Sequence, residues 1–417
     1  MARFEAALAR ASAECGLLPA AHAEVISRVC AEAAFDAAGL ARAARQAGTL
    51  AIPFVKALTE KVATASPDAA RHVHFGATSQ DVLDTAVALC HREAGKRLTG
   101  LARDVGDALA EFARRHGGTP LLARTLLQPA APVPFGWKAA MWLAPFARTM
   151  PALRSALGDA CVLQLGGASG TLSAFGERAA EISDAVAHAL QLRRRPTWHS
   201  ARDGFARYGA EMAILAGISA KVAGDIALLM QAEVGELAEP AAAGRGGSSS
   251  MPHKRNPALS MLALEAGRRV PGLAATLLNQ LQGEQERGLG QWQSQWLTLR
   301  ELACATASAA AALLEVLRGL EVHGAAMRDN IERTQGLVFS EVLALRTSRK
   351  LAERLCEKAV RDKRHLRDIV GGDAEAARGL TAAEVDALFD PAASYGTAPG
   401  MTREVLTDWA KARESAL

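Results

Sequence analysis

The sequence predicts an all-α protein, and three observations support that prediction. Half of the 417 residues are hydrophobic but only 5% are aromatic, and alanine and leucine supply most of the apolar content. Both are strong helix formers, whereas the β-branched and aromatic residues that favour strands are scarce. Apolar residues recur at steps of three and four in several segments. No segment alternates apolar and polar residues strictly enough to predict a sheet.

The length suggests about three domains. The helical pattern is weakest at 117–137, 164–176, 241–257 and 390–400. We place an N-terminal helical domain at 1–95, a central helix-bundle domain at 96–340 and a small C-terminal helical domain at 341–417.

Two amphipathic stripes predict long helices in the central domain. The first stripe consists of Leu98, Leu101, Val105, Leu109 and Phe112. Basic residues followed by glycine, at 114–118, are a typical helix end. The second stripe consists of Leu215, Ile218, Val222, Ile226 and Leu229. Small residues lie between its members, which indicates close packing by neighbouring helices.

Composition argues against several classes of protein. The net charge of +4 is too small and too evenly distributed to predict nucleic-acid binding. The six cysteines form no CxxC pair, so we expect neither a zinc site nor disulfides, and free cysteines suit the cytoplasm. The apolar run 302–314 is shorter than the ~20 residues of a membrane span and predicts a helix buried on every side. We therefore expect a soluble protein without a membrane partner.

The segment 244–257, hereafter the signature loop, is the strongest functional feature. It begins with glycines and serines, continues with Lys254 and Arg255, and ends in Asn256-Pro257 before an apolar run. Asn256 is a favoured N-cap and Pro257 a favoured first helical residue. A helix N-terminus beside two cations would bind an anion. The alternative is a flexible surface loop.

Three other segments are ambiguous when taken alone. Thr78 and Asp81 have the spacing of a capping box before an apolar helix. The segment 124–132 reads as a proline-rich connector. The segment 164–171 is rich in glycine but is not GxGxxG, so it does not predict a dinucleotide site.

Together these segments resemble the fumarase/aspartase superfamily. The stretch 247–257, GSSSMPHKRNP, is similar to the GSSxMPxKxNP signature of that superfamily. The segments 74–81 and 124–132 resemble its first and second signature regions. Within the superfamily, the strings at 74–86, 164–172, 230–240, 288–296 and 334–338 are most similar to the 3-carboxy-cis,cis-muconate cycloisomerase group.

The resemblance implies a homotetramer whose active sites each take segments from three subunits, with no cofactor and no metal. It implies a small polycarboxylate substrate and chemistry on carbon next to a carboxylate, through an aci-carboxylate intermediate. Ser248 and His74 are the expected catalytic residues. The expected substrate-binding residues are Thr78, Ser79, Arg124, Thr125, Gln128, Ser249, Lys254, Asn256 and Arg287. His253 is expected to have a gating or packing role.

Departures from the family pattern leave the reaction open. Relatives carry a histidine in the second region, where this chain has Leu126 and Pro129. Relatives also carry histidine and glutamate in the strings at 284–287 and 292–296, where this chain has glutamine at Gln285, Gln293 and Gln295. These losses weaken amine elimination, which needs a proton donor, more than lactonisation, in which a carboxylate adds within the substrate. We predict lactonisation of a carboxymuconate. The alternatives are a lyase that releases an amine or nitrite from a succinate-like substrate, and an inactive scaffold.

Overall fold

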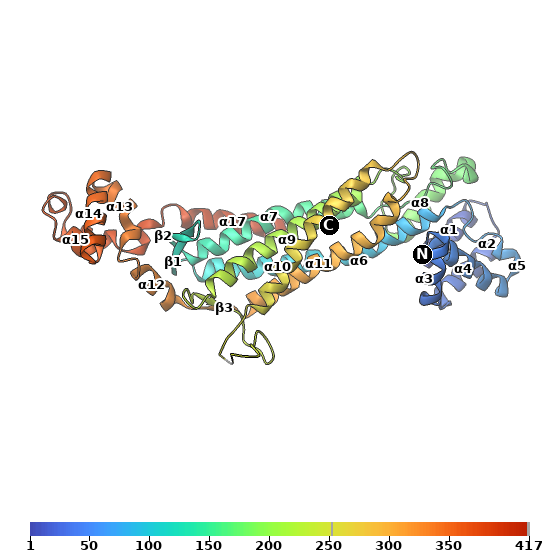
Figure 1. Cartoon of the computed structure of the whole chain (residues 1–417). Helices are drawn as coiled ribbons and strands as arrows, with labels where there is room; N and C mark the ends of the chain where they lie inside the picture. The colour runs from blue at the N-terminus through green and yellow to red at the C-terminus, as the bar shows by residue number, and fades with distance from the viewer. Residues whose placement is uncertain (252, 415–417) are drawn as a thin grey trace.

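The computed structural model describes residues 1–251 and 253–414, and it confirms the all-α prediction. The molecule is elongated, with a central bundle of long helices and a smaller helical unit at each end (Figure 1). Its buried apolar side chains form three clusters, one in the bundle and one in each end unit. The domain limits at 95 and 340 stay a prediction, since α6 runs unbroken through residue 95.

Within the described residues, the bundle contains six long helices: α6 (Ser79–Arg115), α7 (Phe135–Ala160), α9 (Asp203–Leu229), α10 (Ala258–Asn279), α11 (Gln291–Arg318) and α17 (Ala398–Glu414). Both predicted stripes lie in it, on α6 and α9. Leu98, Val105 and Leu109 of the first stripe are buried, as are Leu215, Val222 and Ile226 of the second. α17 returns from the far end of the chain to pack on α7.

The N-terminal unit contains α1 (Ala2–Glu14), α2 (Ala20–Glu32), α3 (Ala37–Ala47), α4 (Ala51–Ala65) and α5 (Pro67–Ala70), joined by η1 (Ser173–Arg178) and α8 (Ala179–Leu190). α8 packs on α1, so the unit is built from two separate stretches of sequence. The start of α6 lies against this unit, which brings the first signature region into contact with it.

The C-terminal unit contains α12 (Gly324–Glu332), α13 (Ser340–Arg346), α14 (Arg349–Asp362), α15 (Leu366–Gly371) and α16 (Ala382–Leu388). Short 3-10 turns complete the chain: η2 (Gln280–Gln282), η3 (Leu337–Phe339), η4 (Ala376–Arg378) and η5 (Pro391–Ser394). The unit lies at the opposite end of the bundle from α1 (Figure 1).

The segment predicted to be a connector at 124–132 is part of a β-hairpin. β1 (Pro120–Thr125) pairs antiparallel with β2 (Gln128–Pro134), and β3 (Leu237–Ala238) pairs with β4 (Glu321–Val322). The sequence did not show these strands because prolines occupy several positions and the strands are short. Both pairs lie near the C-terminal unit (Figure 1).

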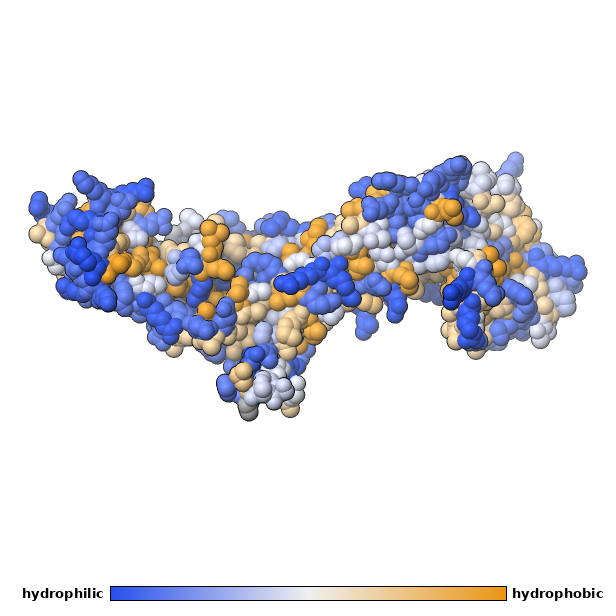
Figure 2. Space-filling view, viewed as in Figure 1, coloured by the Kyte–Doolittle hydropathy of each residue, from blue (hydrophilic) through white to orange (hydrophobic). Residues whose placement is uncertain are grey.

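The bundle leaves apolar side chains in solvent. Exposed examples on its long helices are Ile214, Leu228, Met261, Leu262, Leu278 and Leu297. Figure 2 shows apolar patches along the bundle between the two end units. An apolar surface of this kind is typical of helices that meet another protein surface.

One prediction about the apolar helices is wrong. The run 302–314 lies in α11 but is not buried on every side, because Cys304 and Ser308 are exposed. By length and composition alone, α9 and α11 could each cross a membrane. Both are bundle helices, and 44% and 61% of their apolar windows are buried inside this chain. A bundle core therefore accounts for much of that composition.

Candidate active site

The first signature region forms one half of the candidate site, at the junction of α6 and the N-terminal unit. Thr78 is the N-cap of α6, and the Asp81 carboxylate accepts the Thr78 backbone N–H at 3.0 Å, which confirms the predicted capping box. Ser79 is the first residue of the helix. The Arg287 guanidinium lies beside them and donates to the Thr78 hydroxyl at 3.2 Å. It also donates to the Ala168 carbonyl at 3.4 Å. The chain itself thus brings Thr78, Ser79, Arg287 and the 164–171 segment together.

A buried polar network supports this half-site from below. Asp81 has no exposed surface and accepts four hydrogen bonds, three of them from the backbone N–H groups of Thr78, Gly166 and Gly167. The fourth comes from His199 Nε2 at 2.8 Å. A carboxylate that accepts so many donors fixes the segments that carry them.

A second buried carboxylate extends the network to α11. The Asp84 carboxylate accepts hydrogen bonds from both terminal nitrogens of Arg202, at 2.5 and 3.1 Å. It also accepts one from the Trp292 indole N–H, at 2.9 Å. Arg202 also donates to Gln295. The Gln80 side-chain amide donates a hydrogen bond to the His199 carbonyl, and its oxygen accepts one from Arg287 Nε at 2.9 Å. Arg287 is therefore held on both sides, by Gln80 and by Thr78.

His74 lies at the edge of this half-site and is paired with the N-terminal helix. Its Nδ1 lies 2.7 Å from the Glu5 carboxylate on α1. Burial lowers the pKa of His74, but the hydrogen bond and charge of Glu5, with Asp81, outweigh burial and raise it above the ordinary value. Because Nδ1 is engaged, a substrate contact would have to use Nε2.

The second signature region is the β1–β2 hairpin at the other end of the bundle. Thr125 and Gln128 face each other and close a two-residue turn, and both side chains are exposed. Arg124 donates through both terminal nitrogens to Glu236, at 2.9 Å each. Glu236 is fully buried and also accepts from Asn330 at 2.7 Å. This pairing gives Arg124 a clear part in anchoring the hairpin to the bundle.

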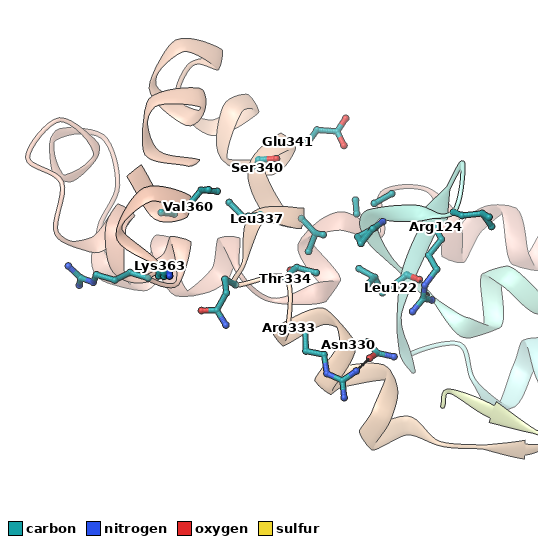
Figure 3. Close-up of a pocket in the computed structure, with 18 of the residues that line it drawn as sticks. Leu122, Arg124, Asn330, Arg333, Thr334, Leu337, Ser340, Glu341, Val360 and Lys363 are labelled. Atoms are coloured by element: carbon teal, nitrogen blue, oxygen red, sulfur yellow. Dashed lines mark hydrogen bonds between the residues drawn. The ribbon is translucent and has the colours of Figure 1, made fainter. Parts of the chain in front are cut away.

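A large hollow of about 1180 Å³ lies between the hairpin and the C-terminal unit. Figure 3 shows Arg124 and Leu122 on one side of it and Arg333, Thr334 and Leu337 on the other. Leu127 and Pro129 of the hairpin also line it. The hollow therefore adjoins Pro129, one of the two positions at which the family resemblance leads us to expect a histidine.

The signature loop leaves the bundle after β3 and projects from it as a separate lobe (Figure 1). Its neck is formed by Gly246 and Asn256, whose backbone N–H donates to the Gly246 carbonyl at 2.8 Å. A Cβ on Gly246 would lie 2.4 Å from the Asn256 carbonyl oxygen, and Gly246 has a φ of +64°, so only glycine fits there. Pro252 lies outside the described residues. Ser249, His253 and Lys254 are exposed, whereas Arg245 and Ser248 are half-buried.

Ser248 sits inside this lobe with two backbone donors on its hydroxyl. The N–H groups of Met251 and Ser250 point to Ser248 Oγ, at 3.1 and 3.4 Å. Donors on this oxygen stabilise negative charge on it, which a serine needs to act as a base.

The predicted helix start after the loop is wrong in detail. α10 begins at Ala258, Pro257 takes the N-cap position, and Asn256 does not cap the helix. The buried Glu239 carboxylate accepts the N–H groups of Leu259 and Ser260 instead, at 3.1 and 2.8 Å. The anion at this helix N-terminus is therefore the Glu239 carboxylate of the protein itself.

One chain keeps the first and second regions far apart. α6 starts in the first region and ends just before the hairpin, and its 37 residues span roughly 55 Å at ~1.5 Å per residue. No small substrate reaches across that distance. The chain thus assembles the first region with Arg287 at one end, and the hairpin at the other.

Sequence reasoning missed His199, Arg202, Glu236 and Glu239. All four side chains are buried, and each forms hydrogen bonds with a carboxylate, a guanidinium or the first N–H groups of a helix that is distant in sequence. The cluster of polar residues just before the apolar start of α9 was a usable signal for His199 and Arg202. Nothing local marks Glu239 as the cap of a helix that begins 19 residues later.

Comparison with known proteins agrees with this fold and these segments. A family model described as Lyase matches residues 1–272. The 3-carboxy-cis,cis-muconate cycloisomerase of Bradyrhizobium diazoefficiens is 43% identical, over 97% of this chain and 92% of its own. The crystal structure of the 3-carboxy-cis,cis-muconate lactonizing enzyme from Pseudomonas putida superposes with a TM-score of 0.92 at 39% identity, covering 99% of this chain and 94% of that one. The nitrosuccinate lyase of Streptomyces davaonensis is 40% identical, over 96% of this chain and 88% of its own.

The chain therefore belongs to the lyase family of the fumarase/aspartase superfamily. Its near-complete overlap with the cycloisomerase sequences and structures places it beside that group of enzymes within the family.

Proposed function

We propose that this protein is a cycloisomerase that lactonises 3-carboxy-cis,cis-muconate. The observation that carries the proposal is the near full-length likeness to enzymes of that name, at 43% and 42% identity, together with an intact signature loop. The reaction is an isomerisation. One substrate carboxylate adds through its oxygen to a double-bond carbon, and the carbon next to another carboxylate takes up a proton.

Ser248 delivers that proton in the lactonising direction and removes it in the reverse direction. The two N–H donors on its Oγ lower the cost of the alkoxide that remains after proton transfer. Lys254 and Asn256 would hold the dianionic aci-carboxylate, with Ser249 and the loop backbone beside them. Because the lobe joins the bundle through a narrow neck, it can close over the substrate and exclude water.

The first region binds a second carboxylate of the substrate. Thr78 and Ser79 offer hydroxyl donors, and Arg287 offers a guanidinium that Gln80 and Thr78 already orient. Thr125 and Gln128 would contribute from the hairpin, with Arg124 behind them, and His74 would use Nε2. Small carboxylates suit these groups, because nearly every one is a cation or a hydrogen-bond donor.

These groups meet only if different copies of the chain combine. The first region and the hairpin of one copy are roughly 55 Å apart along α6. The exposed apolar side chains on α9, α10 and α11 offer the surface on which copies would pack. We therefore propose a homotetramer whose central helices form one core and whose sites are shared.

Elimination of nitrite from a nitrosuccinate-like substrate is the second candidate. The 40% identical nitrosuccinate lyase supports it, as does Pro129 in place of a histidine, since nitrite leaves without needing a proton. An ultraviolet assay that follows loss of the diene absorbance of 3-carboxy-cis,cis-muconate tests the first proposal. Turnover supports it. No turnover, with nitrite released from nitrosuccinate, would replace it with the second.

A further inference from the structure

The turn of the β1–β2 hairpin has an unusual composition for its conformation. Thr125 pairs with Gln128, so Leu126 and Leu127 alone form the turn. Both have a positive φ, 51° and 65°. A two-residue hairpin turn with positive φ at both positions favours Asn-Gly, because a Cβ is strained there. Two leucines are therefore a poor choice for the turn itself.

Burial within the chain does not explain the two leucines either. Leu126 is 98% exposed and Leu127 is 71% exposed. Water contact on two neighbouring leucine side chains is unfavourable. Both the backbone conformation and the solvent exposure of the turn disfavour leucine. We therefore expect that a contact with another molecule stabilises leucine at these two positions. Strain that persists at an exposed tip commonly marks a functional site.

The surroundings of the turn indicate what covers it. The turn is bounded by Thr125 and Gln128, both expected to bind substrate. Leu127 and Pro129 line the hollow of about 1180 Å³, whose facing wall carries Arg333 and Thr334 (Figure 3). The tip therefore combines polar flanks with an apolar centre. A polycarboxylate with an unsaturated carbon chain has the matching pattern, with charged ends and an apolar middle.

We propose that Leu126 and Leu127 are specificity-determining residues that form the apolar wall against the carbon chain of the substrate. The inference rests on the proposed function and deepens it, because it assigns the hydrocarbon part of the substrate to the turn. The neighbouring donors hold the carboxylates, and the leucines exclude water from the double bonds. Substrates with shorter carbon chains, such as substituted succinates, gain less from this wall.

The test replaces the leucines by the residues that the turn itself favours. The double variant Leu126→Asn/Leu127→Gly keeps the hairpin and relieves its strain, so its melting temperature should equal or exceed that of the wild type. Its kcat/KM for 3-carboxy-cis,cis-muconate should fall about 10- to 100-fold, because two apolar contacts are lost. The variant Leu126→Met/Leu127→Met keeps apolar volume and should stay within about threefold of the wild type. Leu345→Asn, at an 81% exposed leucine away from the hairpin, controls for loss of surface leucine as such.

Two outcomes would overturn the proposal. One is an Asn-Gly variant with wild-type kcat/KM. The other is an Asn-Gly variant whose activity loss is accompanied by a change in oligomeric state, which would assign the leucines to subunit contacts instead. Calorimetric titration with cis,cis-muconate separates this proposal from the function. If the wild type does not turn over 3-carboxy-cis,cis-muconate, the proposed function fails. In that case, the proposed role of the leucines is supported if cis,cis-muconate binds the wild type at least about tenfold more tightly than the Asn-Gly variant. It is contradicted if the two proteins bind cis,cis-muconate equally or if the wild type does not bind it.

Discussion

The two ends of the candidate site are built in opposite ways. At the start of α6, buried carboxylates fix the first region: Asp81 accepts four hydrogen bonds and Asp84 accepts Arg202 and Trp292. Among the described residues of the signature loop, the Ser248 hydroxyl contacts two backbone N–H donors and the Ser250 hydroxyl. The two ion pairs of the loop, Arg245 with Glu315 and Arg255 with Glu321, are partly exposed. One end is embedded in a polar core, and the other is a lobe on a narrow neck.

This difference suggests a division of labour between the two ends. A rigid first region can orient a substrate carboxylate before reaction, at little further entropic cost. A loop with few fixed contacts can open for entry and close for the proton transfer. Variants at the two ends should therefore fail differently: changes in the loop should reduce turnover, and changes in the buried network should reduce stability.

The largest expected effect is on turnover, at Ser248. Ser248→Ala should lower kcat about 10²- to 10⁴-fold, the range for loss of a positioned acid or base. The melting temperature should not change, because Ser248 lies in the exposed lobe. Met251→Leu is the matched control from the same lobe: it keeps the backbone N–H donor to Ser248 and should keep most activity. A Met251→Leu loss as deep as that of Ser248→Ala would remove the special role of Ser248.

The next effect is on stability, at the opposite end. Asp84→Ala leaves the Arg202 guanidinium buried without its partner and should lower the free energy of unfolding by about 3–5 kcal/mol. Glu315→Ala breaks the exposed ion pair of the loop and should cost at most about 1 kcal/mol. Denaturant titration measures both. Equal costs would contradict the contrast between a rigid end and a mobile end.

A smaller effect is expected on substrate binding, at Arg287. Arg287→Lys keeps the charge but loses the planar contacts with Gln80 and Thr78. KM should rise about tenfold with kcat nearly unchanged, since the contact serves substrate and transition state alike. Arg300→Lys, on the exposed side of α11, is the control. A fall in kcat at constant KM would instead place Arg287 in the chemical step.

The smallest effect is a pH dependence of stability from His74. Its pKa is raised because the Glu5 hydrogen bond and charge, with Asp81, outweigh burial, which lowers it. The protonated form is favoured in the folded state, so this contribution is fully present below the ordinary histidine pKa of about 6.5. It is lost as pH rises through the raised value. Unfolding free energies from pH 6 to 9 should show the loss in the wild type but not in His74→Gln.

Local patterns in the sequence were enough for the fold class and several of its details. The stripes on α6 and α9 and the capping box at Thr78 depend on neighbours along the chain, and all three are confirmed. The hairpin was missed because its strands are short and carry prolines, and because Leu126-Leu127 does not match the usual turn residues. The start of α10 was misplaced because its cap, Glu239, comes from a distant part of the chain.

The candidate site shows the same limit. The resemblance located the loop serine and the first-region hydroxyls by motif. The buried partners that hold them, such as His199 and Arg202, carry no motif of their own and become visible only through tertiary contacts. The separation of the first region from the hairpin also depends on the length of α6, and the stripe of apolar residues in the sequence did not reveal that length.

We propose that a complete site combines the first region of one copy with the loop and the hairpin of other copies. The most direct test is co-expression of Ser248→Ala with Arg287→Ala, assayed at a substrate concentration well below KM, where the loss of either residue leaves little activity. In a mixed oligomer, random assembly gives about a quarter of the sites a wild-type loop and a wild-type Arg287, so activity should return to about a quarter of the wild-type level. If the mixed oligomer forms but stays as inactive as the single variants, each site is built from one copy, which would contradict the proposed shared site.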